Sequence, residues 1–211
     1  MSMPYEATGR TAQKARTRAV LVAAAREMVA AGLTPTIEDA AAAASVSRAT
    51  AYRYFANKRE LLFAAHPETA ATSMLPPDPP KDPAARLDAV VRNFSAMVLD
   101  TEAQQRTMLR LSLEADADER AELPLRQGRA VAWIAEALED LKDDRSDEEV
   151  CQLVLSIRAT IGIEALVWLV DIGGLSRADA VALTRWSAQA LLQRATSIPP
   201  PMPGSSSSQS N

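Results

Sequence analysis

Residues 36–63 read TIEDAAAAASVSRATAYRYFANKRELLF, and this stretch decides the fold. It predicts two short helices on either side of a turn at Ser45-Val46, followed directly by a third helix. The expected helix N-caps are Thr36, Ser47 and Asn57, because their side-chain oxygens can accept hydrogen bonds from unpaired backbone N–H groups. An acidic residue three positions after Thr36 and after Asn57 favours capping boxes. We therefore expect a helix-turn-helix over about residues 36–55.

The second short helix of this stretch has two different faces. At about 100° per residue, Ala51 and Phe55 share the face that would pack on the first helix, with Val46 closing the turn. The opposite face is cationic, hydroxylic and aromatic. Because the second helix of a helix-turn-helix enters the DNA major groove, this face predicts DNA binding. The candidate DNA-binding residues are Thr36, Ser47, Arg48, Ala49, Thr50, Tyr52, Arg53, Tyr54 and Lys58.

Residue chemistry suggests separate roles within that set. Arg48 is the best candidate for bidentate recognition of a guanine edge, and Thr50 could contact a thymine methyl, a base or a phosphate. Four residues suit backbone phosphates through their hydroxyl or ammonium groups, namely Thr36, Tyr52, Tyr54 and Lys58. The pattern alone leaves open an ordinary helical hairpin whose tyrosines cover the core.

Four runs, at 35–41, 44–47, 50–55 and 57–62, together resemble the N-terminal domain of TetR-type (tetracycline-repressor-like) transcriptional regulators. The resemblance spans about residues 13–73. It implies phosphate contacts for the four residues just named and base contacts for positions 47–53. It also implies an all-α second domain that usually encloses a ligand pocket, with its last two long helices forming a dimer bundle. The role of repressor rests on this resemblance alone.

Three departures from the family pattern concern small residues. Ser45 stands where the family usually has a turn glycine, so we expect a left-handed φ at a residue that carries a side chain. Ala40 and Ala51 replace larger aliphatic residues, and Ala49 replaces a frequent glycine and could contact a thymine methyl. These departures bear on the operator sequence and leave the phosphate-binding groups in place.

The composition predicts an all-α protein. Of the 211 residues, 47% are hydrophobic and only 7 are glycine, with alanine and leucine dominant. The single Cys151 excludes an internal disulfide and suits a reducing cytosol. The most apolar window is interrupted by Glu164, so we expect no membrane span and a cytoplasmic protein.

Charge is unevenly distributed along the chain. Residues 1–65 hold nine Lys/Arg and five Asp/Glu, a formal charge of +4, in a chain whose formal net charge is −4. The other residues therefore carry −8. A basic N-terminal part joined to an acidic remainder would direct only the N-terminal part toward phosphate.

The expected organisation has four parts. A mobile basic arm covers 1–12, the helix-turn-helix domain covers 13–73, a helical ligand-binding and dimerisation domain covers 84–197, and a disordered tail covers 198–211. Five prolines between positions 76 and 83 form a stiff connector. Apolar spacing predicts later helices at about 84–99, 102–116, 124–142, 147–171 and 176–196.

The second domain offers two expectations about partners. Apolar stripes on 147–171 and 176–196 predict that these helices pair two copies into a homodimer, although they could simply complete the monomer core. A group of bulky or adaptable side chains suggests a pocket for an unknown small-molecule effector. The group includes one carboxylate that Arg158 or a cationic ligand could neutralise. The candidate pocket residues, for which a plain core is the alternative, are Phe94, Met97, Met108, Trp133, Glu164 and Trp168.

Enzymatic signals are weak. We expect His66 at the surface and Cys151 in the core, and the chain has no zinc-ligand spacing, phosphate-binding glycine loop or nucleophile elbow. The sequence thus predicts a DNA-binding transcriptional regulator, and we expect it to be a repressor that a small ligand releases from its operator. We expect no catalytic residues, metal or cofactor. The alternatives are a regulator without a small-molecule site and a helical interaction module that does not bind DNA.

Overall fold

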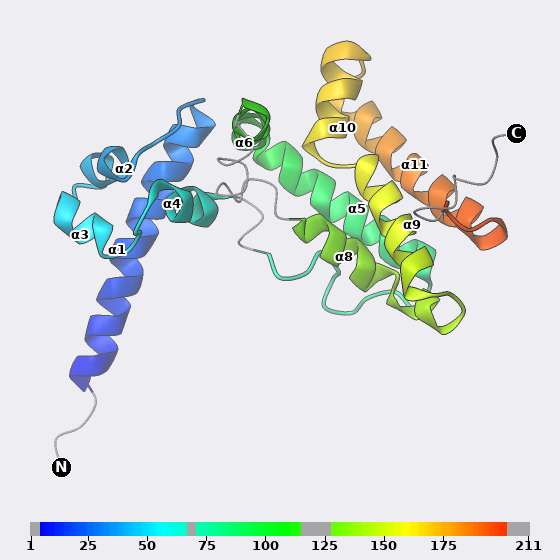
Figure 1. The fold of residues 1–211 in the computed structure, drawn as a ribbon, viewed down its shortest axis with the longest axis horizontal. Coiled ribbons are helices and arrows are strands. Elements are labelled where there is room, and N and C mark those ends of the chain that lie inside the picture. The colour runs from blue at the N-terminus through cyan, green and yellow to red at the C-terminus, as the bar shows by residue number, and fades with distance from the viewer. Residues whose placement is uncertain (1–4, 67–70, 115–127, 202–211) are drawn as a thin grey trace, which may run out of the picture. The chain divides into compact units, whose positions relative to one another are not determined.

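The computed structural model describes residues 5–66, 71–114 and 128–201, and every regular element in those ranges is a helix (Figure 1). The all-α prediction is confirmed. The chain divides into two compact units, which we call the head unit and the body unit. The head unit comprises residues 1–70 and 101–127, and the body unit comprises 71–100 and 128–211.

The head unit is built around α1 (Tyr5–Ala30). Three shorter helices and α6 complete it: α2 (Ile37–Ala43), α3 (Arg48–Tyr52), α4 (Lys58–Ala65) and α6 (Glu102–Glu114). Apolar side chains from α1, α2, α4 and the α3 region form one core, including Leu21, Ala25, Ile37, Ala41, Ala51, Phe55 and Leu61. Burial of Ala51 and Phe55 confirms the inward face expected for the second short helix.

Helix α6 belongs to the head unit, although the sequence predicts residues 102–116 to be a helix of the second domain. Met108 of α6 is buried against Val29 of α1 and Leu62 of α4. Gln104 Nε2 donates to the Arg26 carbonyl oxygen at 3.0 Å, and so ties α6 to α1. Apolar spacing identifies the buried face of a helix but carries no information about its packing partner, which is why this assignment differs.

Helix α1 begins at Tyr5, inside the stretch that is expected to be a mobile arm. Missing apolar periodicity is the basis of that expectation, and it indicates only that a segment has no buried face. The alanines, arginines and lysine of the early part of α1 are strong helix formers without such a face. In Figure 1 this part of α1 extends beyond α2, α3 and α4.

The predicted caps order the helix-turn-helix. Thr36 and Asp39 form a reciprocal capping box on α2, and Ser47 accepts from the Thr50 N–H at the start of α3. Asn57 caps α4 by accepting from the Glu60 N–H at 2.9 Å. The Glu60 carboxylate accepts from the Ala56 N–H instead of the Asn57 N–H, so the third box is shifted by one residue.

The turn between α2 and α3 contains the expected strained residue. Ser45 has φ of 54° and is the one non-glycine residue with positive φ among the described residues. The Val46 N–H donates to the Ala41 carbonyl at 2.8 Å, and the Ser45 N–H donates to the Ala42 carbonyl at 3.1 Å. These paired bonds are a Schellman motif, which requires the left-handed conformation at Ser45.

The body unit packs long helices against one another. Its elements are α5 (Pro83–Asp100), α8 (Arg129–Ala137), the 3₁₀-helix η2 (Glu139–Asp143), α9 (Asp147–Ala159), α10 (Ile163–Val167), the π-helical turn η3 (Trp168–Ile172) and α11 (Arg177–Ser197). Helix α5 contacts α8 and α11, and α9 contacts α8 and α11. Arg185 of α11 donates from Nε and Nη2 to the two carboxylate oxygens of Asp88 on α5, both at 2.8 Å.

The helix expected over 147–171 is interrupted. Gly162, with φ of 91°, separates α9 from α10, and Arg158 Nη1 donates to the Ile161 carbonyl at 2.9 Å across the break. The run Asp147–Ile172 is, by length and composition, the single stretch among the described residues that is apolar enough to cross a membrane. Val150, Val154 and Ile157 bury part of that apolar surface in the body core.

The proline-rich segment before α5 is held by side chains of the body unit. Trp133 Nε1 of α8 donates to the Thr72 carbonyl at 3.2 Å, and Asn93 Nδ2 of α5 donates to the Met74 carbonyl at 2.8 Å. Ser73 Oγ donates to a Glu136 carboxylate oxygen at 2.7 Å. The connector is therefore anchored to α5 and α8 before its prolines begin.

Two expectations about single residues are wrong. His66 is buried at the end of α4, and Cys151 is exposed on α9. His66 directly follows a helix that buries four of its eight residues, so the chain is still inside the core when it reaches this position. Cys151 lies beside Val150 on α9 but one residue further around the helix, which turns it outward.

Replacing Ser45 by glycine should stabilise the head unit. A left-handed conformation costs a residue with a side chain roughly 1–2 kcal/mol, and glycine avoids this cost. Glycine also makes the unfolded chain more flexible, which offsets roughly 0.5–1 kcal/mol of the stability gained. We expect Ser45→Gly to raise the free energy of unfolding by about 0.5–1 kcal/mol in urea titrations followed by circular dichroism. Ser45→Ala is the control and should give no such gain. A destabilised glycine variant would contradict the strain.

The Asp88–Arg185 pair should make stability depend on pH. Hydrogen bonds from Arg185 hold the pKa of Asp88 below its ordinary value of 3.8. The stabilisation is therefore present above that value and is lost as the pH falls through the lower folded-state pKa. Asp88→Asn should lower the free energy of unfolding at pH 7 by about 1 kcal/mol or less, because the pair is partly exposed, and should lower Tm accordingly. In calorimetry the difference from the wild type should shrink below pH 3.8. Asp78→Asn, in the exposed loop, should show no such trend.

Candidate nucleic-acid interface

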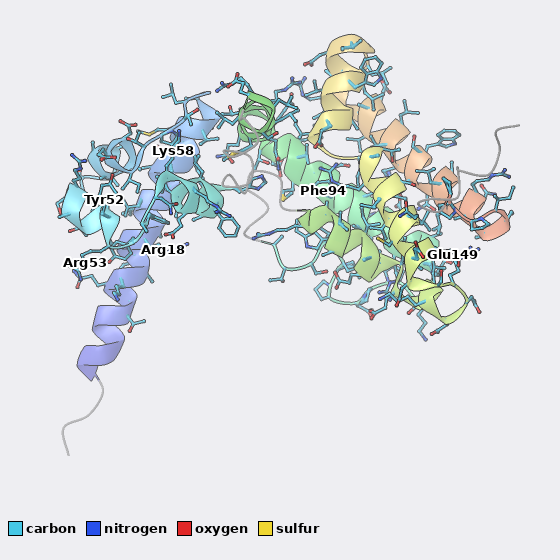
Figure 2. All side chains as sticks on the ribbon, in the orientation of Figure 1. Arg18, Tyr52, Arg53, Lys58, Phe94 and Glu149 are labelled. Atoms are coloured by element: carbon cyan, nitrogen blue, oxygen red, sulfur yellow. The ribbon has the colours of Figure 1, made fainter. Side chains whose placement is uncertain are left out.

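Helix α3 presents its outer face to solvent because its inner face is fixed in the head core. Ala51 is fully buried and Phe55, just after the helix, is nearly so. The Ser47 hydroxyl accepts from the Thr50 N–H at 3.2 Å and donates to Thr50 Oγ1 at 2.8 Å, which orders the first turn. Figure 2 shows Tyr52 and Arg53 at α3 and Lys58 at the start of α4.

All nine predicted DNA-binding residues are at least partly accessible in the head unit. Thr50 and Tyr54 are half-buried, and the other seven are exposed. They come from three places: the N-cap of α2, the α3 region and the first residue of α4. The structure therefore brings the set together on consecutive elements of one small domain.

The hydroxyl of Thr36 is already engaged in the protein. Thr36 Oγ1 donates to Asp39 Oδ2 at 2.7 Å and accepts from the Asp39 N–H at 3.1 Å. These bonds from Thr36 hold the pKa of the Asp39 carboxyl below its ordinary value. A phosphate contact by Thr36 would therefore share this hydroxyl with the cap.

Sequence reasoning missed Glu38 of α2, which faces two of the predicted DNA-binding residues. Glu38 Oε1 lies 2.7 Å from Arg48 Nη2 and accepts a 2.8 Å hydrogen bond from the Tyr52 hydroxyl. The Arg48 guanidinium carbon is also 5.8 Å from the centroid of the Tyr52 ring. The Tyr52 hydrogen bond, with a smaller contribution from Arg48, lowers the pKa of Glu38 below its ordinary value. Only the acidic character of position 38 signals this contact in the sequence.

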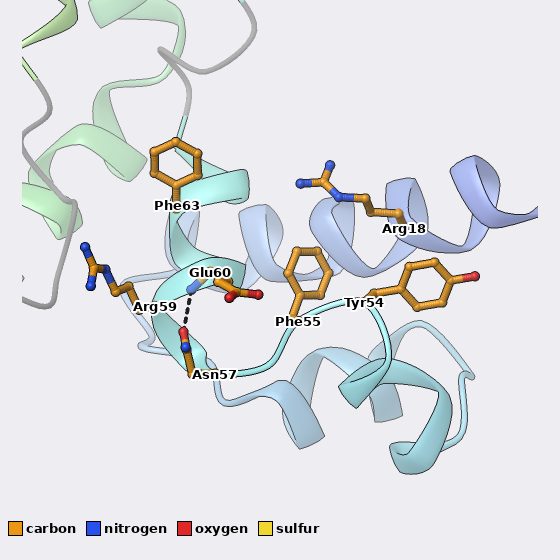
Figure 3. A pocket seen from close by; sticks show the side chains of 7 residues that line it. All are labelled: Arg18, Tyr54, Phe55, Asn57, Arg59, Glu60 and Phe63. Atoms are coloured by element: carbon orange, nitrogen blue, oxygen red, sulfur yellow. Dashed lines mark hydrogen bonds between the residues drawn. The ribbon is translucent and has the colours of Figure 1, made fainter. Parts of the chain in front are cut away.

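An open depression of about 490 Å³ adjoins the α3–α4 loop (Figure 3). Arg18 of α1 lies beside it with its guanidinium carbon 5.3 Å from the centroid of the Phe55 ring. In Figure 3 the Arg18 and Tyr54 side chains lie near one another at one end, and Phe63 lies toward the other. The depression is lined by Arg18, Tyr54, Phe55, Asn57, Arg59, Glu60 and Phe63. It thus adds a cation from α1 to the neighbourhood of Tyr54.

The six residues expected to line a ligand pocket lie in separate places. Phe94 and Trp133 are buried in the body core with ring centroids 5.7 Å apart, whereas Met108 is buried in the head unit. Met97 is half-buried on α5. Glu164 and exposed Trp168 line a different depression of about 340 Å³ on the body unit. Spacing along one chain could not reveal that these side chains belong to different cores.

The carboxylate of Glu164 has the partner that the sequence suggested. Arg158 Nη2 lies 3.2 Å and 3.3 Å from its two oxygens. Within the part of the chain that the structure describes, no cluster of His, Cys, Asp and Glu side chains could hold a metal ion. The body unit therefore offers a polar and apolar depression without a preformed metal site.

Comparison with known proteins identifies the head unit. Residues 20–65 match the family model described as "Bacterial regulatory proteins, tetR family". A similar solved structure is titled "Crystal structure of a TetR transcriptional regulator from Rhodococcus sp. RHA1", with a TM-score of 0.56 and 20% sequence identity. The similarity covers 86% of this chain and 98% of that one, and at this identity it shows the fold alone. A search of curated proteins finds no match.

The helix-turn-helix and the matched family model identify the head unit as the DNA-binding domain of a bacterial transcriptional regulator. Residues 20–65 therefore form an N-terminal domain of the type found in the tetR family of bacterial regulatory proteins. The resemblance seen in the sequence is confirmed.

Proposed function

We propose that the chain is a homodimeric cytoplasmic repressor that binds operator DNA through α3 and is released by a small-molecule ligand of the body unit. The observation that carries the proposal is the exposed cationic, hydroxylic and aromatic face of α3 above the buried Ala51 and Phe55. The formal +4 charge of residues 1–65, within a chain of net −4, supports approach of this unit to phosphate.

The contacts divide into base reading and backbone positioning. Arg48 carries a rigid guanidinium that suits the O6 and N7 atoms of guanine, and Ala49 and Thr50 offer methyl groups that suit thymine. The groups that suit phosphate contacts are those of Thr36, Tyr52, Tyr54 and Lys58. Ser47 and Arg53 lie in the stretch 47–53, which we expect to face the bases. The 72% exposure of the Arg48 side chain supports its access to a base edge.

An apolar surface on the body unit supports the dimer. Trp168 and Ile172 of η3 are 60% and 67% exposed, and Trp186 of α11 is 67% exposed. Leu155 and Leu183 add exposed apolar area on α9 and α11. Large apolar side chains gathered on the last helices favour a surface that is buried in an assembly. Two heads are also needed to contact successive major grooves.

The depression beside this surface is the candidate effector site. Leu169 and Leu183 supply apolar lining, and Thr160, Glu164 and Ser187 supply polar groups. A small ligand with both characters would match this mixture, and a second body unit docked on Trp168 would enclose it. The chain passes between the two units after residues 70, 100 and 127, which supplies covalent routes for coupling.

The proposed switch is a shift between two populations. A ligand that binds one body conformation more tightly would favour that conformation, and the altered head spacing would no longer match two major grooves. A regulator without a small-molecule site is the second candidate, supported by the Arg158 contact that already satisfies Glu164. Thermal-shift measurements against a metabolite panel separate the two, because only the first candidate gains stability from a ligand.

Substituting two head cations should separate base reading from phosphate binding. We expect Arg48→Ala to reduce sequence preference at one base pair, by about 1–3 kcal/mol. Lys58→Ala should weaken binding to all sequences alike and reduce the salt slope by about 1. Fluorescence anisotropy with operator and scrambled duplexes at several salt concentrations measures both. If Arg48→Ala weakened binding to operator and scrambled duplexes equally, base reading by Arg48 would be contradicted. If the wild type did not bind DNA, or bound it without salt dependence, the interaction-module alternative would be favoured.

Placing a charge on the exposed apolar surface should dissociate the dimer. We expect Trp186→Arg to yield monomers in light scattering coupled to gel filtration, because an unpaired charge would be buried at the interface. Val20→Arg, an exposed apolar position on the head unit, is the matched control and should stay dimeric. A dimeric Trp186→Arg protein would contradict this interface.

A further inference from the structure

We propose that Glu38 determines the DNA specificity of this protein by holding Arg48 in a base-reading orientation and away from phosphates. The inference rests on the proposed role of α3 as the reading helix. Glu38 is not itself one of the expected DNA contacts; it acts through Arg48 and is therefore a positioning residue.

The geometry joins α2 to the reading face of α3. Glu38 lies one residue after the buried Ile37, and its carboxylate extends to two side chains of α3. A single oxygen, Oε1, receives both the Arg48 guanidinium at 2.7 Å and the Tyr52 hydroxyl at 2.8 Å. The guanidinium is also within 5.8 Å of the Tyr52 ring centroid. Two contacts thus restrict one long, exposed arginine side chain, and the Tyr52 hydrogen bond holds the carboxylate that it contacts.

The contact leaves Arg48 able to read a base. A guanidinium has five N–H donors in a planar fork, and the Glu38 contact involves only Nη2. The remaining donors can still form the bidentate pair with a guanine edge. Because the orientation is fixed before binding, less side-chain entropy is lost when that pair forms.

The same carboxylate disfavours indiscriminate phosphate binding. An arginine without a partner would bind any nearby phosphate. A phosphate contact carries no sequence information. Moving Arg48 to a phosphate would leave the Glu38 charge without its cation on a surface that faces polyanionic DNA. Glu38 thereby penalises binding in which Arg48 finds no matching base, which is a repulsive element of specificity.

The alternative origin of an acidic residue here is direct reading of cytosine, since a carboxylate can accept from cytosine N4. The observed contacts favour the positioning role, because Oε1 accepts from both Arg48 and Tyr52 and these bonds hold the carboxylate against α3. The two roles predict opposite behaviour toward non-operator DNA, so one variant distinguishes them.

Glu38→Gln in the full-length chain removes the charge and keeps the side-chain size. We expect affinity for scrambled duplex to rise about 5-fold, operator affinity to change less, and the salt slope on scrambled duplex to become steeper by about 1. Arg48→Ala should abolish the effect of Glu38→Gln in the double variant, because the proposed action passes through Arg48. The matched control is Glu27→Gln, which removes the same charge from an exposed position on α1.

Each outcome bears on the proposal. An unchanged ratio of operator to scrambled affinity in Glu38→Gln, with operator preference intact in the wild type, overturns the role of Glu38 alone. Weaker operator binding with unaltered scrambled binding indicates direct cytosine reading and also overturns it. An equal increase in Glu27→Gln reduces the effect to general charge and does the same. A wild-type chain without operator preference overturns the reading role of α3 and this inference together.

Glu38→Asp supplies a second variant if the glutamine variant is poorly folded. It keeps the charge but shortens the side chain by one methylene, so the carboxylate no longer reaches Arg48 in the same way. We expect the operator-to-scrambled ratio to fall in this variant as well. A wild-type ratio in a folded Glu38→Asp protein would show that charge alone is sufficient and would contradict positioning through the contact.

Discussion

The burial of Ala51 and Phe55 in the head core is the constraint on which the rest of the DNA-binding surface depends. Helix α3 has only five residues and would be unstable alone, so its orientation comes from this anchoring and from the Ser47 cap. Once the inner face is fixed, the 3.6-residue period sends Arg48 and Tyr52 outward. The reading surface is thus a geometric consequence of two buried side chains and not of an intrinsic preference of the outer residues.

A strained turn and a surface contact refine that arrangement. Ser45 accepts a left-handed conformation so that the Schellman motif can end α2 and redirect the chain into α3. Glu38 then connects α2 to α3 on the solvent side, opposite the apolar contact on the core side. The two short helices are joined on both faces, which limits the movement of the reading surface. Specificity and local rigidity would therefore share one structural origin.

Local signals in the sequence predicted local structure well. The caps at Thr36 and Ser47, the inward Ala51 and the left-handed Ser45 each follow from residue chemistry within a few positions, and the structure confirms them. Contacts between distant positions were not predictable in the same way. The Glu38–Tyr52 bond joins residues 14 positions apart, and Met108 has an apolar spacing that fits either unit. The break at Gly162 was missed because an apolar stripe continues across it.

The body unit combines an exposed apolar surface with a neighbouring depression, whereas the head unit carries the family signature and the cationic face. This division assigns DNA reading and its proposed control to different units of one chain. The most direct measurement of the central claim is selection of genomic DNA fragments bound by the full-length protein. The account predicts enrichment of an inverted repeat whose half-sites are separated by whole helical turns. Absence of any enriched sequence would contradict it.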